Sequence, residues 1–141
     1  GQIAGKLAFK YAIAVLDDTA SYADLTRLQE CLQTDIRSAL HKVGGDDVPA
    51  PPVSYFSLSG GDICMSMLKR PQDGAEKELI VRFYNLSAHP SSARFACFGT
   101  IREVTEANMK EEAVKAVEHE SDVFDIHLAG WKIQTYRIKF E

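Results

Sequence analysis

The chain has 141 residues, of which 45% are hydrophobic and 26% charged, and its formal net charge is −4. This length corresponds to one domain that can bury a core of its own. The acidic balance, without a basic stripe, argues against nucleic acid as a partner. No apolar run reaches the ~18–20 residues of a membrane-spanning helix, so we expect no membrane partner either.

Three cysteines, Cys31, Cys64 and Cys97, lie far apart and belong to no Cys-x-x-Cys or Cys/His motif. An odd number of isolated cysteines fits a reducing compartment better than a disulfide-built scaffold, so we expect a cytoplasmic location. We interpret all three as small buried hydrophobic residues. The sequence begins at Gly1 without a methionine, and we interpret it as a fragment of a longer protein.

The first predicted element is a β-strand over Lys6–Leu16, where large hydrophobic residues alternate with small or polar ones. A helix is predicted next, with Ser21 as its N-cap and Asp24 as the capping-box partner. Apolar residues spaced by three and four predict one buried helix stripe, formed by Leu25, Leu28, Leu32, Ile36 and Leu40. Three prolines within Asp46–Pro52 predict a loop.

Beyond Pro52 the sequence consists of short apolar segments separated by turn residues. The predicted strands are Val53–Leu58, Ile63–Leu68, Glu78–Leu86, Arg94–Phe98, Ile101–Asn108, Val123–Leu128 and Trp131–Phe140, while Val114–Val117 is ambiguous. Closely spaced strands without intervening helices predict a mainly β fold, an antiparallel β-sandwich with one helix near the N-terminus. We expect a single domain over residues 1–141, with the strand, helix and loop in 5–52 and the sandwich in 53–141.

Few residues are arranged for catalysis. Asp125 and His127 lie two apart on a predicted strand and share a face, so they could bind a metal or act as an acid–base pair. No third ligand is indicated, and we interpret them as a solvent-facing polar pair. The sequence therefore predicts no catalytic, cofactor-binding or metal-binding residue in this chain.

Other motifs are also interpreted as structural. Ser59–Asp62 is glycine-rich but lacks the lysine of a phosphate-binding loop, so we predict a hairpin turn there. Adjacent carboxylates occur at Asp17-Asp18, Asp46-Asp47 and Glu111-Glu112. All three pairs lie at the ends of elements or in loops, where we expect solvated surface.

The stretch from residue 53 to 87 carries a more specific pattern. An apolar strand ends in a lysine, an acidic turn contains Asp-Gly, and the next strand reads Ile-Val-Arg-Phe-Tyr-Asn. This order resembles the C-terminal β-domain of glycoside hydrolase family 38, the α-mannosidases. Residues 9–13, 107–112 and 132–138 are similar to further strands of that family. The motif positions are Lys69, Asp73, Gly74, Arg82, Tyr84 and Asn85.

The resemblance implies that the chain is the non-catalytic C-terminal domain of a zinc-dependent, retaining α-mannosidase. The zinc ligands, nucleophile and acid/base of such an enzyme belong to an N-terminal catalytic domain, so we expect no cofactor here and no activity of this piece alone. Its partners would be the remaining domains of the parent and, through the parent, an α-mannoside substrate. The six motif positions would serve structural or interface roles.

Two questions stay open at the level of sequence. Lys69 and Arg82 lie on or beside apolar strands, so each needs a partner: an acid of a missing domain or, as we favour, solvent or an intramolecular partner. The chain could also form a homo-oligomer. The alternative function is a stand-alone carbohydrate- or protein-binding β-sandwich module, for which Trp131 is the candidate residue that stacks on a sugar.

Overall fold

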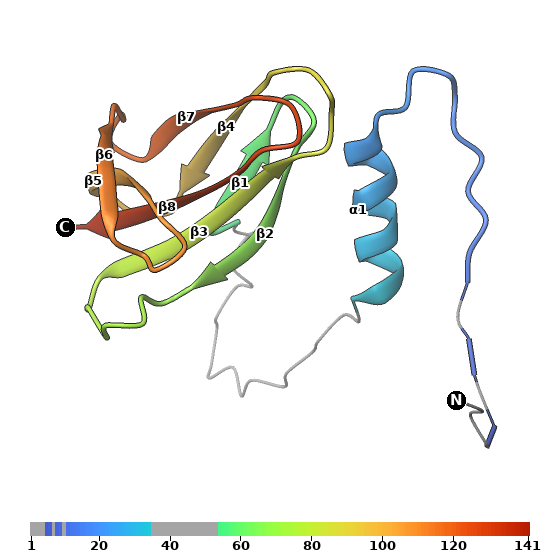
Figure 1. Cartoon of the computed structure of the whole chain (residues 1–141), viewed down its shortest axis with the longest axis horizontal. Coiled ribbons are helices and arrows are strands. Elements are labelled where there is room, and N and C mark those ends of the chain that lie inside the picture. Colours follow the sequence, from blue (N-terminus) through green and yellow to red (C-terminus); the bar gives the residue numbers. More distant parts are fainter. Residues whose placement is uncertain (1–4, 7, 10, 35–53) are drawn as a thin grey trace, which may run out of the picture.

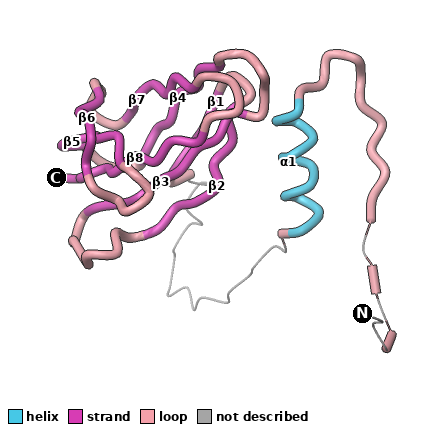
Figure 2. The backbone as a smooth tube through the Cα atoms, viewed as in Figure 1, coloured by secondary structure: helices cyan, strands magenta, loops and turns pink. Residues whose placement is uncertain are grey.

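The computed structural model describes residues 5–6, 8–9, 11–34 and 54–141. This part of the chain forms one helix and a β-sandwich, and the helix lies at one side of the sandwich (Figures 1 and 2). The elements are α1 (Tyr22–Gln33), β1 (Phe56–Ser59), β2 (Ile63–Lys69), β3 (Glu78–Asn85), β4 (Ser91–Cys97), β5 (Ile101–Ala107), β6 (Ala113–Val117), β7 (Val123–Leu128) and β8 (Ile133–Phe140).

The strands form two antiparallel sheets of unequal size. One sheet has three strands in the order β1-β4-β7, and the other has five in the order β2-β3-β8-β5-β6. The predicted mainly β sandwich is thus confirmed. Each strand predicted from Val53 onward corresponds to an observed strand with slightly different bounds, and the ambiguous Val114–Val117 belongs to β6.

Aromatic side chains join the inner faces of the two sheets. Phe83 and Tyr136 come from the five-stranded sheet, and Phe95 and Phe124 come from the three-stranded sheet. Ring centroids lie 5.1 Å apart for Phe83–Phe95, 5.6 Å for Phe95–Phe124 and 5.3 Å for Phe124–Tyr136. Burying a phenylalanine contributes about 1.5–3 kcal/mol, so this cluster is a major part of what holds the sheets together.

The hairpin predicted at Ser59–Asp62 is wrong, because the segment crosses between sheets. β1 pairs with β4, whereas β2 pairs with β3 in the other sheet. At the crossing Gly61 has φ +57°, and its backbone lies against Ser91 and Ser92. A Cβ on Gly61 would come within 2.5 Å of the Ser92 carbonyl oxygen, which explains why glycine is needed there.

The strand predicted over Lys6–Leu16 is also wrong, since no described residue of this segment is in a strand. A strand needs a neighbour for its backbone hydrogen bonds, and none of the described strands pairs with it. Four of its large side chains, Phe9, Tyr11, Ile13 and Val15, are between 82% and 96% exposed. In Figure 1 the segment runs on the far side of α1 from the sandwich.

The helix begins as predicted. Ser21 is the N-cap, and its hydroxyl accepts a bond from the Asp24 N–H while the Asp24 carboxylate accepts one from the Ser21 N–H. The buried stripe is wrong for Leu25 and Leu28, which are 48% and 43% exposed, because α1 makes little contact with the sandwich, chiefly beside β2. Ala23 is the buried residue of α1.

The predicted stripe residues Ile36 and Leu40, and the predicted proline-rich loop, lie outside the described residues. Within the described part of the chain, the structure contains no helix with the length and apolar character to span a membrane.

We predict that Gly61→Ala destabilises the sandwich by about 2 kcal/mol or more, because the new Cβ adds a backbone clash to the strain of a positive φ. Gly74→Ala is the matched control: its φ is +77°, but nothing lies within 4 Å of the added Cβ. Urea unfolding of both variants measures the difference. Equal losses would show that the close approach at Gly61 carries no cost.

Candidate functional site

The six motif positions do not gather at one point. Lys69, Asp73 and Gly74 lie at the end of β2 and in the turn that follows it, while Arg82, Tyr84 and Asn85 lie along β3. They are divided between two turns and the outer face of the five-stranded sheet.

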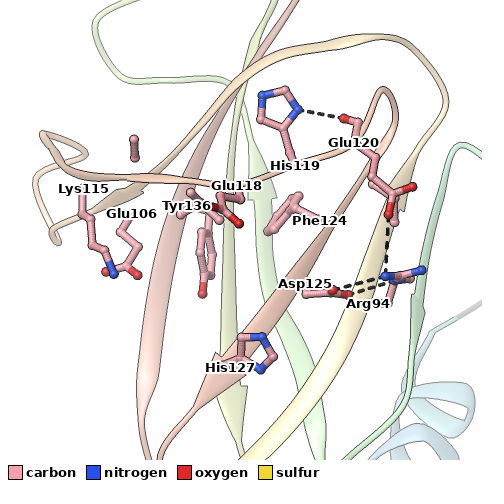
Figure 3. Close-up of a pocket in the computed structure, with 13 residues that line it drawn as sticks. Arg94, Glu106, Lys115, Glu118, His119, Glu120, Phe124, Asp125, His127 and Tyr136 are labelled. Carbon is pink, nitrogen blue, oxygen red and sulfur yellow. Dashed lines mark hydrogen bonds and ion pairs between the residues drawn. The ribbon is translucent and has the colours of Figure 1, made fainter.

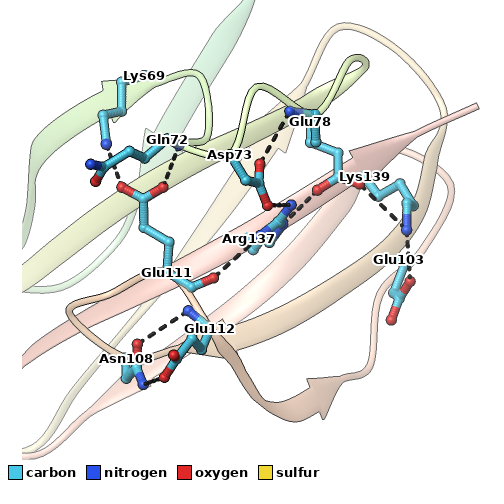
Figure 4. A network of polar contacts seen from close by, with 11 residues as sticks. Lys69, Gln72, Asp73, Glu78, Glu103, Asn108, Glu111, Glu112, Arg137 and Lys139 are labelled. Carbon is cyan, nitrogen blue, oxygen red and sulfur yellow. Dashed lines mark hydrogen bonds and ion pairs between the residues drawn. The ribbon is translucent and has the colours of Figure 1, made fainter.

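A network of charged groups joins the β2–β3 turn to the β5–β6 turn and to β8 (Figure 4). Arg137 is its centre: Nε lies 2.5 Å from Glu78, and Nη2 lies 2.8 Å from Asp73. Lys69 forms an ion pair with Glu111. Lys69 therefore finds its acid within the chain, as we favoured from the sequence, and the network links strands rather than forming an open site.

Glu111 corrects a prediction, because it is 7% exposed rather than solvated. Its carboxylate accepts a bond from Lys69 and a 2.7 Å bond from the Gln72 backbone N–H, and these two contacts lower its pKa below the ordinary value. The residue also has a positive φ of 68°. The contacts that hold this strained acid come from residues about 40 positions earlier in the chain, which local sequence does not reveal.

Asn85 holds two turns together from a buried position. Its Nδ2 lies within 3.2 Å of three carbonyl oxygens, those of His89, Leu128 and Ala129. Its Oδ1 accepts a 2.8 Å bond from the Ser87 N–H. The amide thus joins the β3–β4 turn to the end of β7, which is a structural function.

The other two β3 motif residues also make contacts within the chain. The Arg82 Nε donates to the Thr135 hydroxyl at 2.9 Å, so the partner found in the described structure is a hydroxyl rather than an acid. Tyr84 is partly buried beside Cys64, and burial raises the pKa of its phenol.

Asp125 and His127 form no hydrogen bond or ion pair with each other. Asp125 pairs with Arg94 through two bonds of 2.9 and 3.2 Å, and this contact lowers the Asp125 pKa. His127 Nδ1 lies 2.8 Å from the Ser92 hydroxyl. Both are exposed polar side chains, as predicted.

The described residues contain no group of three histidine, cysteine or acidic side chains that could hold a metal ion. Cys64 and Cys97 are buried as predicted, and burial raises the pKa of the Cys97 thiol to about 11. Cys31 is exposed on α1, so the prediction of burial is wrong for this residue. All three are free thiols.

A groove of about 710 Å³ opens where β6 and β7 border the sandwich (Figure 3). We call it the β6–β7 groove; its polar lining groups include Glu106, Lys115, Glu118, Asp125, His127 and Tyr136. Sequence reasoning noticed only Asp125 and His127, because the lining comes from strands β4 to β8 and their loops. Glu106 and Tyr136 occupy inward-facing positions in the alternation of their strands. This alternation is the sequence signal that could have revealed the groove.

The architecture defines the chain as an antiparallel β-sandwich domain. The chain belongs to the family described as the glycosyl hydrolases family 38 C-terminal beta sandwich domain, whose model matches residues 62–136, just over half of the sequence. The resemblance stated from the sequence is thereby confirmed, and it supports a family 38 glycoside hydrolase as the parent protein. No curated protein matches the chain.

We predict that Lys69→Met destabilises the domain by about 1–3 kcal/mol at pH 7, because it leaves the Glu111 carboxylate without its cation. The value lies below that of a fully buried pair because the Lys69 side chain is 38% exposed. The folded-state pKa of Glu111 is lowered, so its stabilisation is present above the unfolded pKa of about 4.3 and is lost as the pH falls through the folded value.

Urea unfolding of the Lys69→Met variant and the parent chain at pH 7 and below pH 4 measures this effect, and the difference should shrink at acidic pH. Lys110→Met, in the β5–β6 turn that carries Glu111 but without an ion pair to the described residues, is the control and should be neutral. A loss for Lys69→Met that persists unchanged at low pH would contradict an electrostatic origin.

Proposed function

We propose that this chain is the non-catalytic C-terminal domain of a zinc-dependent, retaining α-mannosidase, and that it packs on the other domains of that enzyme. Membership of the family 38 C-terminal sandwich supports the glycosidase parent. The α-mannoside substrate, the zinc and the retaining mechanism are inferred from the resemblance to α-mannosidases.

One observation carries the packing role: the segment at residues 8–16 exposes a row of large apolar side chains. Phe9, Tyr11, Ile13 and Val15 alternate with alanine or lysine, and all four are more than 80% exposed. Burying each would contribute about 1.5–3 kcal/mol. Alternation over an extended segment suits addition to the edge of a sheet, where a neighbouring strand supplies the backbone bonds.

The helix extends this surface. Tyr22, Leu25 and Leu28 of α1 are also exposed, so apolar area continues from the segment onto the helix. Exposed apolar area of this extent is typical of a surface that contacts another protein domain. The other domains of the parent are the occupant we propose, because the family to which the chain belongs is a domain of larger enzymes.

Zinc does not fit the donor set of the described residues. Within the described ranges no three suitable ligands converge, so the ion and the acid/base groups would belong to another domain. The free thiols of Cys31, Cys64 and Cys97 support a reducing, cytoplasmic location for the parent.

We predict that the full-length parent hydrolyses an aryl α-mannoside and loses this activity to a zinc chelator, whereas the 141-residue chain with added zinc releases no aryl group. Release of the chromophore measures both. Cleavage by the chain alone would contradict the non-catalytic role, and a parent that cleaves only glucosides would contradict the α-mannosidase assignment.

We predict that replacing Phe9, Tyr11, Ile13 and Val15 by serine in the full-length parent lowers its Tm by several degrees, because the segment loses its apolar contacts with the neighbouring domain. The same substitutions in the isolated chain should leave the urea midpoint of the sandwich unchanged, since the described sandwich makes no use of these side chains.

Replacement of Ala8, Ala12 and Ala14 by serine in the parent is the matched control, with a smaller expected effect. Sedimentation of the isolated chain tests whether a second copy of this chain, rather than another domain, covers the apolar segment. A stable dimer that the four serines abolish would identify a second copy as the occupant and would contradict the proposed domain contact.

A further inference from the structure

The β6–β7 groove exists because the two sheets differ in width. The three-stranded sheet ends at β7, and β5 and β6 end the five-stranded sheet. Val104 of β5 still packs in the core, whereas Glu106 and Lys115 line the groove. Val81, Tyr136, Glu106 and Lys115 are direct partners across β3, β8, β5 and β6, so they share the inward face. Along this row the side chains change from apolar to charged between Tyr136 on β8 and Glu106 on β5.

Tyr136 lies where the row changes from apolar to charged side chains, and it is the residue on which the inference depends. The residue is 3% exposed and its ring packs on Phe83 and Phe124, yet its hydroxyl makes no hydrogen bond to any described residue. No fully buried polar side-chain atom in the described structure lacks a partner, so this hydroxyl must be the part of the side chain that reaches the groove. Figure 3 shows it pointing between Glu106 and His127.

The protonation state of Tyr136 suits a hydrogen-bond donor. Burial, with a smaller contribution from the Glu106 charge, raises the pKa of the phenol to about 12. The hydroxyl therefore carries its proton at neutral pH and can both donate and accept.

Further polar groups around the groove lack partners within the described residues. Lys115 and Glu118 form no ion pair there, and His127 has its Nε2 free because Nδ1 faces Ser92. Arg94 and Asp125 neutralise each other at one wall. Hydrogen-bond donors and acceptors thus both line the β6–β7 groove.

We propose that the β6–β7 groove binds a neutral, hydroxyl-rich glycan chain, with the Tyr136 hydroxyl and the Glu106 carboxylate contacting sugar hydroxyls at its floor. Each sugar hydroxyl is both donor and acceptor, so a site that offers both kinds of group matches it. The carboxylates of Glu106 and Glu118, which form no ion pair with the described residues, repel an anion.

The volume of about 710 Å³ lies within the range of roughly 300–1,000 Å³ that small-ligand sites occupy. An α-linked mannose chain is the glycan that we expect, and this choice rests on the proposed α-mannosidase parent. The groove lies in the sandwich, while the proposed domain contact lies on residues 8–16 and α1, so each can be tested without the other.

The test is a calorimetric titration of the 141-residue chain with an α-linked mannotriose. We expect saturable binding that Tyr136→Phe weakens about 2- to 12-fold, as loss of one hydrogen bond does, while the ring and the core stay in place. Glu106→Gln keeps the side-chain shape and should weaken binding similarly, and it tests the site if Tyr136→Phe fails to fold.

Trp131→Ala is the control variant. Trp131 is 64% exposed in the β7–β8 turn, away from the groove lining, and is the rival position for sugar stacking. Its replacement should leave the affinity unchanged. Absence of saturable binding to any glycan, or binding lost in Trp131→Ala and kept in both groove variants, overturns the proposal.

A gluco-oligosaccharide distinguishes this proposal from the proposed function. If it binds in place of the mannotriose, and Tyr136→Phe weakens that binding, the glycan groove is supported while the choice of an α-linked mannose chain as its ligand is contradicted. Failure of every glycan to bind removes the groove proposal and leaves the activity and Tm experiments on the full-length parent unaffected.

Discussion

The contact between the aromatic rings of the two sheets is the interaction on which the rest of the structure depends. Phe95 and Phe124 of the smaller sheet pack on Phe83 and Tyr136 of the larger one at centroid distances below 6 Å. Each sheet has one apolar face, and neither can bury it alone. The position of this cluster decides which strands of the wider sheet are covered, and so where the apolar core ends and a polar surface begins.

The two faces of the five-stranded sheet carry polar residues with different roles. On the inner face, the uncovered end carries Glu106 and Lys115, which makes a hydrated groove possible beside the core. On the outer face, Arg137 and its acids tie the turns to β8 (Figure 4). The residues most recognisable in the sequence, such as Lys69 and Asn85, stabilise turns. The family motif in this domain therefore consists of residues that maintain the fold.

The segment at residues 8–16 and the strands of the sandwich share an alternating sequence pattern, but among the described residues only the latter form strands. Alternating side chains form a strand only where another strand offers backbone donors and acceptors. Residues 123–128 find such a neighbour in β4 and are paired along their length. Phe9 and Val15 have the same local pattern without a described neighbour, and they remain exposed. This contrast is the physical basis for expecting a further domain at that surface.

The sequence by itself determined the mildly acidic charge of the chain, where most strands from residue 56 onward lie, where α1 begins, and which family the chain resembles. These properties depend on local periodicity, capping and the order of motifs, all of which can be read within a few residues. Only the tertiary structure decided that Ser59–Asp62 crosses between sheets, that Glu111 is buried against Lys69, and that Tyr136 and Glu106 face one groove. Those features arise from pairings between residues some 30 to 40 positions apart, and local periodicity carries no information about which strand a given strand will meet.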